Sequence, residues 1–235
     1  MKLFITTMPR QEVYWLMNGK EYVRDANGEK VRDPMGYIPV ECDHLRFEGP
    51  CCYPVIPLIN AYVEPGDEVR VLALLAVDER KDVEEEKKWD GLCKVNYDLM
   101  EAEVKQLCES RGVSVTVESL NISMEETTSS QLKLFEKLIS QFQKDSCIYA
   151  DLTFGTKPAM YTQTLALNYA NQVMHNVYVG GVVYGLKLFT GEQKKFLYDL
   201  TKLFLLSQIT HELGKSNIED PLSVIRYILS DDEDN

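Results

Sequence analysis

Polar residues suited to binding an anion gather at one point near the middle of the chain. They stand at the end of the apolar run 147–152, in the order Asp151, Thr153, Gly155, Thr156 and Lys157. Glycine permits a backbone conformation closed to other residues and leaves room for a close ligand. Pro158 suits the first turn of a helix, so a helix is predicted to start here, with Thr156 or Lys157 as its N-cap. The unpaired N–H groups of such a helix start favour an anion or a polar ring.

Two common phosphate-binding motifs do not occur in the sequence. The only Gly-Lys-Ser run is 214–216, and Ile209 stands where the first glycine of a Walker loop should be. No G-x-G-x-x-G follows a predicted strand. The run Asp-x-Thr-x-Gly-Thr-Lys is therefore either a specific binding loop or only a tight turn from a strand into a helix. Composition alone leaves both interpretations open.

Apolar runs alternate with amphipathic stretches along most of the chain, which predicts strands that alternate with helices. The predicted strands are 2–7, 68–77, 113–122, 147–152 and 176–189, and 194–198 is predicted to return antiparallel. Predicted helices cover 53–63, 96–111, 127–143 and a stretch from 158. This order predicts an α/β fold with a Rossmann-like, mainly parallel sheet flanked by helices. Residues 1–199 are predicted to form that domain. Residues 200–235 are predicted to form a short helical extension, with helices at 200–213 and 221–229, a linker between them and an acidic tail.

The helix predicted from residue 158 is apolar on nearly every side. Its apolar residues include Met160, Leu165, Leu167 and Tyr169. A helix of this kind is buried on more than one face. We expect it to lie in the layer against the sheet or at an interface between two subunits.

Residues 11–50 are irregular for a Rossmann-like fold and are predicted to be an insertion after the first strand. A hairpin is predicted around the turn Asn18-Gly19, and further turns follow it. The insertion is expected to project from the sheet over the ligand crevice or a partner subunit. Its aromatic residues either stack on bases or pack the insertion against the body, and we interpret most of them as packing: Tyr14, Trp15, Tyr22 and Tyr37.

Two other strand ends carry candidate site residues. Thr6, Thr7 and Met8 follow the first strand, and Asp78 and Arg80 follow the strand 68–77. In a doubly wound sheet the loops at the carboxyl ends of the strands line the ligand crevice. These residues are therefore site candidates, with an ordinary turn and capping hydroxyls as the alternative.

Cysteine and histidine residues in the insertion raise the question of a metal site. Cys42 and His44 are close in sequence, and Cys51 adjoins Cys52. Their spacing fits no recognised zinc motif, and adjacent cysteines cannot easily chelate one ion together. We interpret them as small buried thiols and predict neither a metal nor a cofactor.

The balance of charge narrows the classes of partner. The formal net charge is −12 and the pI is about 4.8, which argues against a general nucleic-acid binder. No apolar run is long enough to cross a bilayer, and the N-terminus does not read as a signal peptide. The expectation is a cytoplasmic protein with reduced cysteines and no membrane partner. A small anion remains a suitable ligand, because backbone amides and one lysine can bind it locally.

Two motifs resemble those of a known family. Asp151-Leu152-Thr153-Phe154-Gly155-Thr156-Lys157-Pro158 is similar to the D-x-T-G-G-T-K signature of CRISPR-associated Rossmann-fold (CARF) domains, with Phe154 in place of the first glycine. Val183-Tyr184-Gly185, followed by Leu197-Tyr198-Asp199-Leu200-Thr201, resembles the Y-G and Y-D-L-T run that closes the fold in one branch of the family. As an order of elements, the resemblance covers residues 1 to 214.

The resemblance implies that the protein senses cyclic oligoadenylates in type III CRISPR antiviral defence. In the family, two copies pair and the cyclic RNA lies across their shared crevice, which suits a homodimer with a two-fold axis. Cyclic tetra-adenylate is favoured as the ligand over hexa-adenylate. By matching position, the site comprises Thr6, Thr7, Met8, Asp151, Thr153, Phe154, Gly155, Thr156 and Lys157, and we add Asp78 and Arg80 as readers of adenine edges. Asp151 either accepts a hydrogen bond from a ribose hydroxyl or braces the turn, and bracing is favoured.

Two classes of activity remain open for such a domain after it binds its ligand. One is a sensor that passes ligand occupancy to a partner or to an effector in a longer chain. The other is a slow, metal-independent ring nuclease in which Lys157 and Thr6 or Thr7 align a ribose 2′-hydroxyl for attack on the adjacent phosphorus. No histidine has the upstream arginine of the HEPN ribonuclease motif. A nucleotide-binding Rossmann-like enzyme outside CRISPR is a third interpretation, against which the missing glycine fingerprint weighs.

Overall fold

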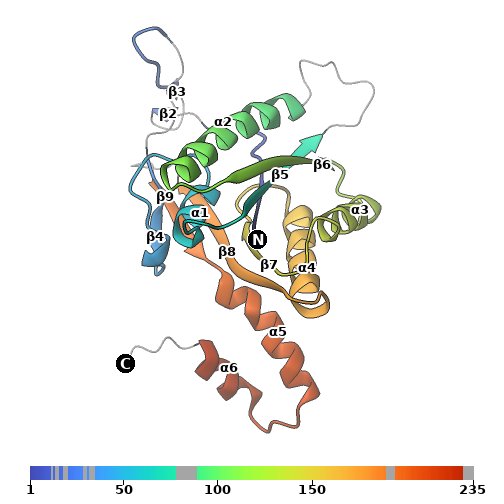
Figure 1. Ribbon diagram of the computed structural model, residues 1–235. Helices are drawn as coiled ribbons and strands as arrows, with labels where there is room; N and C mark the ends of the chain where they lie inside the picture. The colour runs from blue at the N-terminus through green and yellow to red at the C-terminus, as the bar shows by residue number, and fades with distance from the viewer. Residues whose placement is uncertain are drawn as a thin grey trace.

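A seven-stranded, mostly parallel sheet with helices on both faces forms the body of the molecule in the computed structural model (Figure 1). The structure describes residues 1–11, 13, 16–17, 21–28, 31, 35–77, 89–188 and 194–229, with the backbone alone at 16–17, 21–22 and 89–91. The predicted α/β, Rossmann-like class is therefore confirmed. No helix within these ranges has both the length and the hydropathy to cross a membrane.

The strand order contains the Rossmann pattern. Across the sheet the strands are β4 (Ile38–Val40), β9 (Lys194–Asp199), β8 (Val177–Leu188), β7 (Ser146–Asp151), β1 (Lys2–Thr7), β5 (Val69–Val77) and β6 (Val115–Ser123). All neighbours are parallel except β8 and β9, which pair antiparallel as predicted. The five strands β1, β5, β6, β7 and β8, taken in chain order, lie in the spatial order 3-2-1-4-5.

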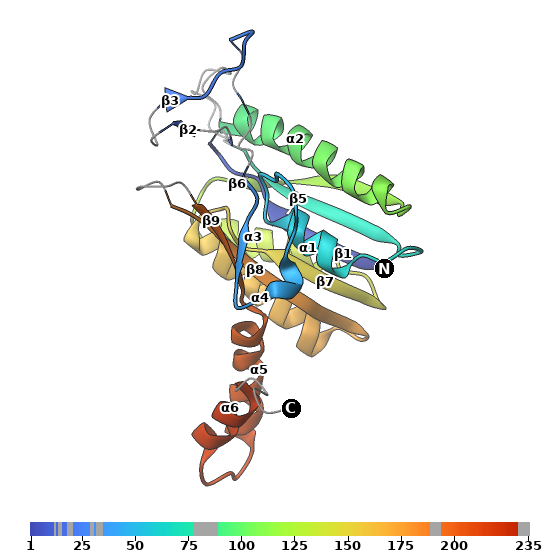
Figure 2. The same cartoon turned by 90° about the vertical axis from the view of Figure 1, so that its left-hand side faces the viewer.

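Helices cover the two faces in two groups (Figure 2). On one face, α1 (Val55–Tyr62) contacts β1 and β7, and α2 (Trp89–Ser110) packs on β5 and β6. On the other face, α3 (Thr128–Ile139) and α4 (Lys157–Val173) pack against each other and against β6 and β8. The chain therefore leaves β1 along one face and arrives at β7 along the other.

The central strands are buried on both sides, which is why they read as nearly continuous apolar runs. In β1, Leu3, Phe4 and Ile5 are buried, and the ring of Phe4 stacks on that of Tyr149 with centroids 4.8 Å apart. Burying one large aliphatic side chain stabilises the fold by roughly 1.5–3 kcal/mol. These strands therefore hold the carboxyl ends of β1 and β7 in a fixed frame.

The insertion after β1 is partly a hairpin and partly an extra strand. β2 (Leu16–Met17) pairs antiparallel with β3 (Glu21–Tyr22), which confirms the predicted hairpin, although Tyr14, Trp15 and the Asn18-Gly19 turn lie outside the described residues. The expectation that the whole insertion projects from the sheet is wrong for β4, which joins the sheet edge parallel to β9. Tyr37 is buried and Cys42, Cys51 and Cys52 are buried thiols.

The element boundaries differ from the predicted ones at three helices. α2 begins at Trp89 rather than at 96, and α3 ends at Ile139 rather than at 143. The chain turns after α3, where Ser140 caps the helix and Asp145 has a positive φ of 59°. α5 (Thr201–Lys215) runs two residues further than predicted, which shortens the linker to α6 (Pro221–Leu229).

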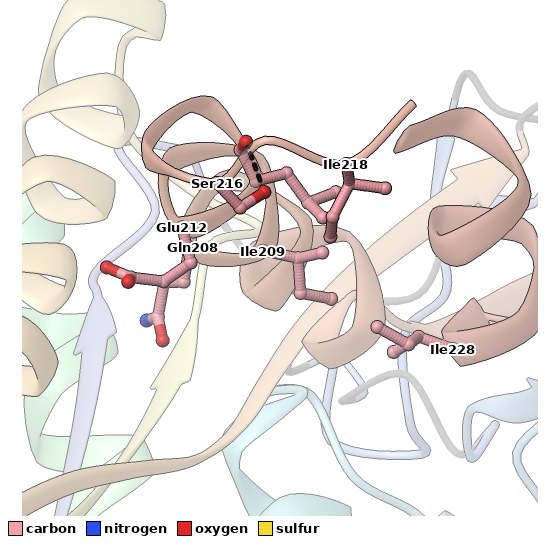
Figure 3. A pocket seen from close by; sticks show the side chains of 7 residues that line it. Gln208, Ile209, Glu212, Ser216, Ile218 and Ile228 are labelled. Atoms are coloured by element: carbon pink, nitrogen blue, oxygen red, sulfur yellow. Dashed lines mark hydrogen bonds between the residues drawn. The ribbon is translucent and has the colours of Figure 1, made fainter. Parts of the chain in front are cut away.

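The C-terminal helices extend away from the sheet (Figures 1 and 2). The first part of α5 is anchored through contacts with β8 and α4 and through the buried Phe204. Beyond it, α5 and α6 form a helical hairpin around a hollow of about 430 Å³ (Figure 3). Ile209, Ile218 and Ile228 line this hollow, and Ile218 and Ile228 are exposed. The predicted domain boundary between 199 and 200 stays a prediction.

Candidate functional site at the switch point of the sheet

The strand order reverses between β1 and β7, and two segments with predicted site residues, Thr6–Thr7 and 151–157, meet there. The crossovers from β1 and into β7 run on opposite faces, and in doubly wound sheets ligands bind at the carboxyl ends of the strands beside such a reversal. β1 ends at Thr7 and β7 ends at Asp151. Thr6 and Asp151 are direct partners in the parallel ladder. The fold thus brings together two segments that are 145 positions apart in the chain.

A buried hydrogen-bond network braces this point. The Thr6 hydroxyl donates to Oδ2 of Asp151 at 2.8 Å, and the N–H of Thr153 donates to Oδ1 of the same carboxylate at 2.9 Å. Neither Thr6 nor Asp151 has any exposed surface. Burial raises the pKa of Asp151 to about 6, and the hydrogen bonds from Thr153 and Thr6 oppose that rise. In the single chain, Asp151 therefore acts as a brace of the turn.

The turn after β7 is tied to the neighbouring strand. Oγ1 of Thr153 accepts a hydrogen bond of 2.7 Å from the N–H of Gly185 in β8. A side chain on Gly185 would not fit, because its Cβ would lie 2.7 Å from Cγ of Pro54. Phe154 is half-buried and packs against the core. The two motifs that carry the family resemblance are thus in direct contact through Thr153 and Gly185.

Gly155 and Thr156 shape the start of α4 as expected. Gly155 has a φ of 114°, a conformation that residues with a side chain rarely adopt. Thr156 is the N-cap, and its hydroxyl accepts a 3.4 Å hydrogen bond from the N–H of Ala159. The first hydrogen bond along the helix runs from Met160 N–H to Thr156 C=O. The N–H of Lys157 precedes it and has no helical partner.

The remaining predicted site residues have different surroundings. Lys157 is exposed in the first turn of α4, with no hydrogen bond or ion pair to any residue that the structure describes. Met8 is fully buried and its N–H donates to the carbonyl of Leu74, so in the single chain it packs in the core. Asp78 and Arg80 lie outside the described residues. The structure therefore gathers the Thr6–Thr7 and 151–157 segments and leaves the roles of Met8, Asp78 and Arg80 as predictions.

One polar residue of the site was not predicted. Gln163 lies on the buried face of α4, and its Nε2 donates to Oγ1 of Thr7 at 3.2 Å. The signal was present in the sequence, because Gln163 stands among Ala159, Ala166 and Leu167 on the face that packs on the sheet. A lone carboxamide among small apolar side chains indicates a specific polar partner.

The second motif closes the fold by fixing the turn from β9 into α5. Oδ1 of Asp199 accepts a hydrogen bond from the N–H of Thr201, and Oγ1 of Thr201 accepts one from the N–H of Val182. Asp199 also lies 3.3 Å from Nε2 of His44 in the insertion. These contacts hold the end of β9 and the insertion against β8, the strand that receives the Thr153 loop.

The outer face of α4 is apolar and exposed. Tyr161, Leu165 and Val173 lie there, and Tyr161 is 66% exposed. The opposite face is buried through Ala159, Ala166 and Ala170. The predicted burial in the layer against the sheet is thus confirmed for one face, and the interface between subunits stays a prediction.

Comparison with known proteins adds no assignment. No family model matches the chain, and no curated protein does. The two motifs and the geometry described above therefore carry the functional argument.

Proposed function

We propose that this protein binds a cyclic oligoadenylate, with cyclic tetra-adenylate favoured, as a sensor in type III CRISPR antiviral defence. One observation carries the proposal. The segment that resembles the CARF signature, 151–157, meets Thr6 and Thr7 at the carboxyl ends of β7 and β1, where a doubly wound sheet binds its ligands. The braced carboxylate of Asp151 supports a preformed loop rather than an incidental turn.

The chemistry of the site suits the phosphates and riboses of such a ligand. The first turn of α4 offers N–H groups and the positive end of a helix dipole, and Lys157 adds an exposed ammonium beside them. Gly155 has no side chain to keep a phosphate from the backbone. An overall charge of −12 disfavours long nucleic acids, whereas these local donors favour a small anionic ring.

The exposed apolar face of α4 supports pairing of two copies. Tyr161 and Leu165 lie one helical turn apart on the helix whose N-terminus forms the proposed site. Pairing through this face would bring two such helix starts near one two-fold axis, which matches the symmetry of a cyclic tetra-adenylate. Light scattering at micromolar concentration should give a dimer mass, and Leu165→Glu should give a monomer. A monomeric mass for the unchanged chain would count against the pairing.

Calorimetric titration with cyclic tetra-adenylate and cyclic hexa-adenylate tests the binding. We expect Lys157→Ala to weaken binding about tenfold to a hundredfold, because it removes a charge-assisted contact to phosphate. Lys144→Ala is the matched control, since Lys144 is an exposed lysine that precedes the amino end of β7, at the opposite end of this strand from the proposed site. Absence of heat and of a thermal shift with both rings would reject the proposal.

A ring nuclease is the second candidate, favoured by the position of Lys157 beside the helix start. In that reaction the ribose 2′-oxygen bonds to the adjacent phosphorus and the bond to the 5′-oxygen breaks, leaving a 2′,3′-cyclic phosphate and a 5′-hydroxyl that takes the proton. The N–H groups and Lys157 would stabilise the charge on the phosphorane. Labelled ligand incubated with excess protein without added metal should then yield linear products. Ligand that stays intact for hours excludes this candidate and leaves the sensor.

A further inference from the structure

Gln163 carries a buried polar group that the proposed function does not use. The residue is 2% exposed, and within the described part of the chain its carboxamide oxygen has no hydrogen-bond partner. Folded proteins pair nearly all of their buried polar atoms, so an unpaired one indicates a requirement other than packing. The other end of the same carboxamide shows what that requirement is.

The orientation of the carboxamide follows from its neighbours. Nε2 lies 3.4 Å from the carbonyl oxygen of Ala159 and 3.2 Å from Oγ1 of Thr7. A backbone carbonyl can only accept, so the NH₂ group must face this side, because the reverse orientation would set two oxygens against each other. The Thr7 hydroxyl therefore accepts from Gln163, and its own proton is left to donate elsewhere.

Thr7 lies directly beneath the Gly155 turn. A Cβ built on Gly155 would stand 3.4 Å from Cγ2 and 3.7 Å from Oγ1 of Thr7. The neighbouring Thr6 already donates its proton to Asp151. Thr7 is thus the hydroxyl at this strand end whose proton no described residue accepts. The residue is 1% exposed, so a ligand oxygen reaches this hydroxyl only if the Gly155 turn above it shifts.

We propose that Gln163 is a positioning residue that holds the Thr7 hydroxyl as a hydrogen-bond donor to a phosphate or ribose oxygen of the ligand. This inference rests on the proposed function and adds to it a residue and a direction of hydrogen bonding. A methionine would fill the same space with no unpaired acceptor, so a purely packing role would not need the carboxamide. Removing the carboxamide should therefore cost binding and leave stability unchanged or higher.

A double-mutant cycle tests whether Gln163 acts through Thr7. We expect Gln163→Met and Thr7→Val each to weaken binding of cyclic tetra-adenylate by about tenfold or more, and the double variant to be no weaker than Thr7→Val. Gln163→Glu should weaken binding at least as much, because its carboxylate takes the Thr7 proton for itself. Thr162→Val is the matched control: Thr162 is buried on the same helix but donates to Gln131 on α3, and its loss should leave binding unchanged.

The outcomes separate this inference from the proposed function. Binding by Gln163→Met equal to the unchanged chain, or effects that multiply to about a hundredfold in the double variant, would overturn it. If the unchanged chain binds neither cyclic ligand, the proposed function fails. The contact between Gln163 and Thr7 is then tested by NMR without ligand. The side-chain amide resonance of Gln163 should then move in Thr7→Val and stay in place in Thr162→Val. A resonance that Thr7→Val leaves unmoved contradicts the contact and with it the inference.

Discussion

The switch point of the sheet buries polar side chains, whereas the α5–α6 hairpin exposes apolar ones. At the switch point, polar side chains such as Thr6 and Asp151 are buried and hydrogen-bonded across 145 positions of sequence. In the hairpin, apolar side chains such as Ile218, Leu222 and Ile228 are exposed, and α6 packs on α5. Buried polar groups are costly unless each finds its partner, so a region that keeps them is held in one arrangement. The contrast indicates that the polar contacts which hold this chain in one arrangement are concentrated at the carboxyl ends of β1 and β7.

The largest expected effect is that of removing the brace. Asp151→Ala leaves the Thr6 hydroxyl and the Thr153 N–H buried without an acceptor and should lower the free energy of unfolding by about 3 kcal/mol. Urea unfolding measures this loss.

A matched change in the hairpin sharpens the comparison. Asp220 also accepts a hydrogen bond from a backbone N–H, that of Ser223, but it is exposed. Asp220→Ala should therefore cost about 1 kcal/mol or less. Equal losses for the two aspartates would break the comparison between the regions.

The same carboxylate should make stability depend on pH. Burial raises the pKa of Asp151 from 3.8 to about 6 in the folded chain, so the folded state holds this proton more tightly than the unfolded state does. Its contribution to stability is therefore fully present below pH 3.8 and is lost as the pH rises through about 6. The decline is at most about 3 kcal/mol, since each unit of pKa corresponds to about 1.4 kcal/mol.

Unfolding experiments on the unchanged chain and on Asp151→Asn at pH 4 and pH 6.5 isolate this contribution. The asparagine cannot titrate. The difference in free energy of unfolding between the two proteins should therefore change by up to about 3 kcal/mol between the two pH values. A difference that is the same at both pH values would show that Asp151 titrates alike in the folded and unfolded chains.

A smaller effect is expected at the glycine of the turn. Gly155→Ala should cost about 1–2 kcal/mol, because an alanine is strained at a φ of 114°. The added Cβ would be in ordinary contact with Thr7, so the cost lies in the backbone. Thermal unfolding measures it, and Gly214→Ala in α5, where φ is not positive and the space is open, is the control that should lose no stability.

The smallest effect is expected on the surface of the hairpin. Leu222→Ser should change stability by no more than about 0.5 kcal/mol, since Leu222 is exposed on α6. A loss above 1 kcal/mol in urea unfolding would mean that the hairpin is held as firmly as the switch point.

The sequence was informative wherever a local pattern decides the structure. Apolar runs predicted the parallel strands, and the Gly155–Pro158 pattern predicted the start of α4, with Thr156 resolved as its N-cap. Three features depended on long-range pairing and were not predictable from neighbours in sequence. β4 is only three residues long, the Thr6–Asp151 pair needs the strand order, and the partner of Gln163 lies on another element. Full burial of Met8 likewise follows from the packing of α2 over the end of β1, where Cys93 contacts the Met8 carbonyl.

The strand β4 has a consequence for how copies of this protein can associate. It forms one edge of the sheet, and Pro39 at its centre lacks the N–H that an added strand would need. A short edge strand with a central proline is a known barrier to edge-to-edge aggregation. Two copies are therefore expected to avoid joining their sheets along this edge, so that self-association there would have to proceed through side chains rather than through a continued backbone ladder.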